Sequence, residues 1–200
     1  MNTALAESVS PGFKQPAVDA QLVFRQILDA MSNPGRIVAL PTSIEPTPDG
    51  LDPATAAVCL TLLDGDTPIW TDLPPSSPSL SWLQFHCGCP FTEDPGRASF
   101  GLATNARRLP GLDAFSPGTD ETPETAASLI VQVDALEPSR GFMLSGPGIP
   151  HRRALKVAGP QENFWDQRQR VCTGFPLGLD LILISGAQLA ALPRTTHVNG

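Results

Sequence analysis

The sequence predicts an α/β protein, a single domain in which a mixed β-sheet is flanked by helices on both faces in a three-layer, Rossmann-like arrangement. Helix-like segments alternate with short β-branched runs in the first half of the chain, which favours a sheet with crossover helices. Strand-like runs dominate the second half. The 200 residues, 41% of them hydrophobic, suffice for one core and are too few for two full domains.

The first elements are a tail and a helix. Residues 1–16 are polar and contain proline, so we expect a flexible N-terminal tail before a single domain over 17–200. Asp19 is a candidate N-cap, and Pro34-Gly35 marks the stop. Between them, apolar residues recur at three- and four-residue spacing at Leu22, Phe24, Ile27, Leu28 and Met31.

Strands and helices alternate up to residue 86. A strand is expected over 36–40, and a proline-rich loop over 41–53. Asp52 can cap a helix that carries Ala56, Val58, Leu60 and Leu63, and a turn at 64–66 leads to a strand over 67–70. A further helix is expected over 78–86.

The remaining elements are mostly strands. Strand-like runs cover 98–104, 127–133 and 142–144, and a glycine-bearing turn follows at 145–148. A charged helix over 163–171 is expected to face water. The apolar runs 179–184 and 189–192 are separated by Ser185-Gly186 and are compatible with a hairpin before a tail over 193–200.

Composition excludes some partners. The formal net charge of -7 argues against nucleic acid, whose binding depends on clustered Lys and Arg. The sequence has neither a signal-peptide pattern nor an apolar run long enough for a membrane span, so we expect a cytoplasmic protein that does not engage a membrane. In that compartment the four cysteines are expected to remain thiols.

One candidate metal site is His86-Cys87-Gly88-Cys89. Imidazole and thiolate are zinc ligands, so the triplet His86, Cys87 and Cys89 suits zinc or thiol redox chemistry. The competing interpretation is a set of small buried thiols, because no second nearby Cys or His pair would complete four ligands. We therefore predict no metal and no cofactor.

Two further segments are candidate ligand-binding or partner-facing sites. Gly146 and Gly148 lie in a turn whose backbone N–H groups can face an anion, although Pro147 removes one donor and a plain turn explains the glycines equally well. Arg194, Thr195, Thr196 and His197 present groups that bind phosphate or phosphonate oxygens. A solvated strand or a docked tail is the alternative.

The expected environment of Arg194 has a consequence. An exposed guanidinium contributes little stability, so Arg194→Ala is expected to leave the fold intact while impairing growth on methylphosphonate.

Asp180 interrupts an apolar strand and must be paired, hydrogen-bonded or placed at an exposed strand end. The sequence contains no hydrolase, zinc-protease or kinase motif, and we assign no catalytic residue.

Several segments, in the same order, resemble the H subunit (PhnH) family of the bacterial carbon-phosphorus lyase system. They are Phe24-Arg25, Ala30-Met31-Ser32-Asn33-Pro34-Gly35, Leu60-Thr61-Leu62-Leu63-Asp64, Asp66-Thr67-Pro68-Ile69-Trp70, Phe175-Pro176-Leu177-Gly178-Leu179-Asp180-Leu181-Ile182-Leu183 and Leu192-Pro193-Arg194-Thr195-Thr196-His197-Val198. The resemblance extends from about residue 16 to the C-terminal end.

The resemblance implies an accessory subunit of a multi-subunit enzyme. It would form a homodimer, join the G, I and J subunits, and be needed when the ribose triphosphate of ATP is transferred to an alkylphosphonate with release of adenine. The alternative left open by the residues is a free-standing α/β enzyme or binder of nucleotides or phosphonates, because the Arg194 to His197 cluster can bind such anions.

Overall fold

The computed structural model describes residues 9–41 and 44–199. Its helices are α2 (Pro16–Ser32), α3 (Pro53–Leu62), α4 (Pro78–Cys87) and α5 (Phe164–Val171). Short 3-10 turns are η1 (Pro95–Arg97), η2 (Ala106–Arg108), η3 (Leu112–Ala114) and η4 (Pro123–Thr125). The strands are β1 (Val38–Ala39), β2 (Ile69–Thr71), β3 (Phe100–Ala103), β4 (Ser128–Gln132), β5 (Ala135–Ser145), β6 (Arg153–Ala158), β7 (Asp180–Ser185), β8 (Gln188–Leu192) and β9 (His197–Asn199).

The main sheet is mixed, which confirms the predicted α/β class. Its six strands follow the order β1-β8-β7-β4-β3-β2. Strands β2, β3, β4 and β7 are parallel, while β8 pairs antiparallel with β7 and with β1. The expected hairpin of the last two apolar runs is therefore present, since Ser185 pairs with Gln188 and Leu181 with Leu192.

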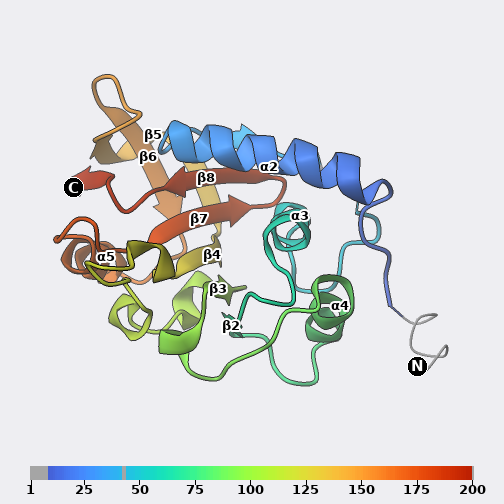
Figure 1. Ribbon diagram of the computed structural model, residues 1–200. Coiled ribbons are helices and arrows are strands. Elements are labelled where there is room, and N and C mark those ends of the chain that lie inside the picture. Colours follow the sequence, from blue (N-terminus) through green and yellow to red (C-terminus); the bar gives the residue numbers. More distant parts are fainter. Residues whose placement is uncertain (1–8, 42–43, 200) are drawn as a thin grey trace.

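Alternating side chains of the central strands divide the core between the two faces of this sheet. Ile130 and Ile182 pack with residues of α2, α3 and α4, whereas Leu129 and Leu181 belong to a second cluster that includes Phe164 of α5. This alternation follows from the two-residue period of a strand. Figure 1 accordingly shows α3 and α4 on one side of β3 and β4, and α5 on the other, while α2 runs alongside β8.

The second face differs from the prediction, because helices do not cover it alone. A three-stranded antiparallel sheet of order β6-β5-β9 contributes Leu136, Leu144 and Leu155 to the cluster on this face. Strand β5 begins only three residues after β4 ends, which leaves no room for a crossover helix. Strand β6 is not predicted by the sequence, because Arg153 and Lys156 interrupt its apolar pattern.

Helix α2 exists as predicted, but it starts earlier, and of the five apolar residues that predicted it only Ile27 is buried, while Met31 is partly buried against the core. It begins at Pro16, and the Asp19 carboxylate accepts the backbone N–H of Gln15 at 2.9 Å from within the first turn. Its buried residues are Val23, Ile27 and Ala30. Four large apolar side chains are instead 44–49% exposed, namely Val18, Leu22, Phe24 and Leu28.

The segment before α2 is partly packed. Residues 1–8 of the expected tail lie outside the described residues. Val9 and Phe13 pack against the core, and the Trp82 indole N–H donates to the Ser10 carbonyl at 2.9 Å. Residues 9–15 therefore lie against α4 as a docked segment rather than as a free tail. Within the described part of the chain, no helix is long and apolar enough to cross a membrane.

Candidate functional site

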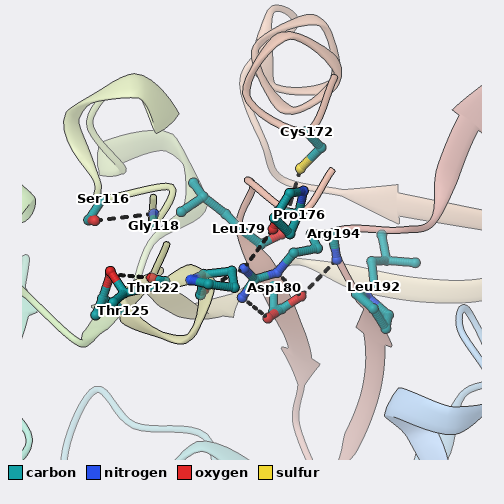
Figure 2. A network of polar contacts seen from close by, with 12 residues as sticks. Ser116, Gly118, Thr122, Thr125, Cys172, Pro176, Leu179, Asp180, Leu192 and Arg194 are labelled. Atoms are coloured by element: carbon teal, nitrogen blue, oxygen red, sulfur yellow. Dashed lines mark hydrogen bonds and ion pairs between the residues drawn. The ribbon is translucent and has the colours of Figure 1, made fainter. Parts of the chain in front are cut away.

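An ion pair joins the two strands of the β7–β8 hairpin at its open end. Asp180 begins β7 and Arg194 follows β8, so antiparallel pairing brings them together. The Asp180 carboxylate accepts the Arg194 backbone N–H at 2.7 Å, Nε at 3.3 Å and Nη2 at 2.7 Å. Figure 2 shows this network. Asp180 is thus paired, which is one of the three environments considered for it.

Arg194 is not the exposed cation that the sequence analysis expected. Its side chain is 16% exposed, and Nη1 also donates to the carbonyls of Pro123 at 2.8 Å and Pro176 at 3.2 Å. The guanidinium therefore ties the segments before β4 and β7 to the end of β8 (Figure 2). These contacts make Arg194 a structural cross-link, and they leave few of its donors for a ligand.

A cavity of about 330 Å³ lies beside this cross-link. It is lined by the C-terminal end of β5, by α5 and by the segment from Arg194 into β9. Among its lining residues are Ser145, Arg168, Cys172, Arg194, Thr196 and His197. The structure thus brings most of the predicted Arg194 to His197 cluster to one cavity.

Arg168 of α5 is the residue in this cavity that the sequence analysis missed. It is 2% exposed, and its Nη1 and Nη2 donate to the backbone carbonyls of Thr196 at 2.8 Å and Pro193 at 2.7 Å. Burial lowers the pKa of its guanidinium. The charged helix was expected to face water, although the four-residue spacing of Arg168 from the buried Phe164 places both on one helix face.

The three residues after Arg194 differ in exposure. Thr195 is partly buried, Thr196 is buried and His197 is exposed. Thr196 and His197 line the cavity, whereas Thr195 is absent from its lining. His197 pairs with Ser145 in the β5–β9 ladder, so this polar tail is an edge strand.

Gly146 and Gly148 have structural reasons for lacking a side chain. Both adopt positive φ, at 128° and 80°. A Cβ at Gly148 would collide with the Ser32 carbonyl and lie 2.8 Å from Pro34 Cδ, and one at Gly146 would lie 2.8 Å from the Thr195 carbonyl. The turn therefore packs closely against the end of α2 and against the segment before β9, and neither glycine lines the cavity.

The His86, Cys87 and Cys89 segment does not form a metal-ligand cluster. No group of three metal-binding side chains occurs among the residues that the structure describes. The His86 ring Nε2 lies 2.9 Å from the Ser10 carbonyl, and the ring packs against Trp82. A hydrogen bond between the two thiols raises the pKa of Cys87 and lowers that of Cys89, and burial raises the pKa of Cys59. All four cysteines are unpaired.

These features define the class of protein: an α/β chain with a cavity lined by arginine and histidine side chains. The family model for bacterial phosphonate metabolism protein (PhnH) matches residues 11–199. The chain therefore belongs to the PhnH family of bacterial phosphonate metabolism proteins.

Two curated relatives agree with this family. One is the α-D-ribose 1-methylphosphonate 5-triphosphate synthase subunit PhnH of Rhizobium meliloti (strain 1021), which is 36% identical over 202 residues that cover 98% of each chain. The other is the putative C-P lyase subunit protein HtxG of Stutzerimonas stutzeri, 36% identical over 180 residues that cover 90% of this chain and 85% of the relative.

Proposed function

We propose that this chain is an accessory subunit of the carbon-phosphorus lyase core complex, needed when the ribose triphosphate of ATP is transferred to an alkylphosphonate with release of adenine. The observation that carries the proposal is the full-length match to a synthase subunit in Rhizobium meliloti. The sequence contains no catalytic motif, which favours an accessory role for this chain over a reaction centre of its own.

The proposed partners are the G, I and J subunits of that complex, in the cytoplasm. Both relatives are named as subunits, which supports association with other chains. The net charge of -7 disfavours nucleic acid as a partner. Four free thiols suit a reducing compartment.

A homodimer completes the proposal, and we assign the exposed apolar residues of α2 to the contact between two copies. Val18, Leu22, Phe24 and Leu28 are each 44–49% exposed. Burial of these side chains between two copies would stabilise the contact.

Co-expression tests the subunit assignment. The chain is produced with the G, I and J subunits, and the complex is separated by size-exclusion chromatography. We expect one joint peak that contains all four chains. Independent elution of this chain at micromolar concentration would contradict the assignment.

Light scattering on the isolated chain tests the α2 contact separately. Leu22→Glu combined with Leu28→Glu should convert a dimer to a monomer, since two charges would lie in the apolar contact. Phe175→Glu is the matched control, because Phe175 is 77% exposed and lies outside α2. A monomeric wild-type chain, or a dimer that survives the double substitution, would contradict the contact between copies.

The cation-lined cavity favours a second candidate function, a free-standing enzyme or binder that acts on nucleotides or phosphonates. Arg168 and His197 supply the donors for such anions. Incubation of the purified chain with ATP and methylphosphonate discriminates the two functions. Turnover by this chain alone would favour the enzyme, and turnover only with the other subunits favours the accessory role.

A further inference from the structure

Arg168 is a buried cation whose charge is not offset by a carboxylate of its own. Its Nη groups donate to neutral backbone carbonyls. The nearby Asp180 carboxylate already pairs with Arg194. Two guanidinium groups therefore share one carboxylate. An uncompensated charge in a protein interior is costly, so an anion at this position would stabilise the fold.

Two hydrogen-bonding atoms beside this charge are also unsatisfied. Arg168 Nε and Thr196 Oγ1 are buried, and neither has a hydrogen-bond partner among the described residues. Both residues are only 2% exposed and line the cavity. Buried polar groups are nearly always hydrogen-bonded, so two unsatisfied atoms on residues that line one cavity point to a missing bound species.

The residues that line the cavity indicate the charge and the size of the missing bound species. Its described residues include two arginines and a histidine, with no aspartate or glutamate, in a chain whose net charge is -7. A hydroxyl and an amide donor are added by Ser145 and Gln169. A volume of about 330 Å³ is at the lower end for ligand pockets, which suits a small anion better than a whole nucleotide.

We propose that this cavity binds a tetrahedral oxyanion, the phosphate or phosphonate group, with Arg168 as its principal cation. The Arg168 Nε–H and the Thr196 hydroxyl would donate to the oxyanion, while Nη1 and Nη2 keep their carbonyl contacts, which fix the plane of the guanidinium. This site does not depend on the accessory-subunit function, because the ligand contacts only residues of this chain.

Titration of the isolated full-length chain tests the site. The readout is the arginine Nε–H resonances in ¹H–¹⁵N spectra, assigned for Arg168 from its loss in Arg168→Lys. Inorganic phosphate, methylphosphonate and ATP are added in separate arms at constant ionic strength. We expect a saturable shift of the Arg168 resonance. The arm with the tightest binding identifies whether free phosphate, a phosphonate or a terminal phosphoryl group is the source of the oxyanion.

Three variants make the test specific. Arg168→Lys, whose binding is measured by calorimetry because it lacks the Arg168 resonance, should weaken binding at least tenfold, since lysine lacks the planar fork. Thr196→Val removes only the hydroxyl, leaves the backbone carbonyl that Arg168 uses, and should weaken binding several-fold with an unchanged circular dichroism spectrum. Arg152→Gln removes an exposed arginine outside the cavity lining and should bind as the wild type does.

Two outcomes would overturn the site. The first is a shift that rises linearly, without saturation, with the concentration of phosphate, methylphosphonate or ATP in all three arms. The second is saturable binding that Thr196→Val and Arg152→Gln leave equally unchanged. Failure to join the G, I and J subunits would not affect this result, since the titration contains no other chain.

Discussion

Asp180 and Arg194 form a three-point contact, in which one carboxylate accepts the backbone N–H and two guanidinium donors of the same arginine. The pair closes the open end of the β7–β8 hairpin, and both side chains are less than one-fifth exposed. Removal of either partner would leave the other charge buried without compensation. The sequence predicted that Arg194→Ala would leave the fold intact, whereas this geometry predicts that the substitution destabilises it.

Arg194→Ala should destabilise the fold by roughly 3 kcal/mol, because it leaves the Asp180 carboxylate unpaired. Urea unfolding measures the change. The matched control is Arg107→Ala, which breaks a pair with Asp134 whose side chains are 60% and 53% exposed, and should cost at most about 1 kcal/mol. Equal effects of the two variants would contradict the structural role of Arg194. If Arg194→Ala is destabilised as expected, any growth defect of this variant on methylphosphonate follows from lost stability.

Gly148→Ala should cost roughly 3 kcal/mol, because alanine is strained at its φ of 80° and the new Cβ would collide with the Ser32 carbonyl. Gly50→Ala is the control, with a φ of 81° and no atom within 4 Å of the added Cβ. It should cost only about 1 kcal/mol. Thermal unfolding distinguishes the two, and equal losses would mean that close packing of the turn is unimportant.

Trp82→Phe should release the segment over residues 9–15. The indole N–H donates to the Ser10 carbonyl, and phenylalanine cannot replace that donor. We expect a loss of about 1 kcal/mol and faster hydrogen exchange or proteolysis in this segment. Trp165→Phe changes a tryptophan that packs against Phe142 and Phe164, and it should leave the segment protected. Unchanged protection in Trp82→Phe would refute the anchoring role.

Stability should fall at high pH because of Cys59. Burial raises the pKa of this thiol above its ordinary value, so the folded state holds the proton after the unfolded state has lost it. Its contribution is complete below about pH 8.5 and declines above that value by about 1.4 kcal/mol per pH unit. Urea unfolding of the wild type and of Cys59→Ala measures the slopes. An equally steep decline in Cys59→Ala would exclude this thiol as the cause.

The sequence predicted the position of α2 but not its packing. Apolar residues at three- and four-residue spacing indicate a helix. They do not identify the buried side when apolar residues lie on more than one face of the helix. Leu22 and Phe24 are exposed, while Val23 and Ala30 are buried. Only the position of the sheet and α3 determines which face is covered.

The candidate site was predicted in part. The segment from Arg194 to His197 was selected for its anion-binding groups, and Thr196 and His197 do line a cavity. The sequence alone could not reveal that Asp180 would form an ion pair with Arg194, or that Arg168 would be buried beside them. These three residues belong to different elements of the fold, and their contacts depend on how β7, β8 and α5 pack.

Local patterns by themselves determined the α/β class, the order of most elements and the hairpin near the C-terminal end, because helix and strand periodicity and turn residues act over a few positions. Tertiary structure decided which charges are paired and which are buried. The electrostatic energy of a charged side chain depends on groups distant in sequence and on how far packing excludes water. The roles of Arg168 and Arg194 could therefore be told apart only in the folded chain.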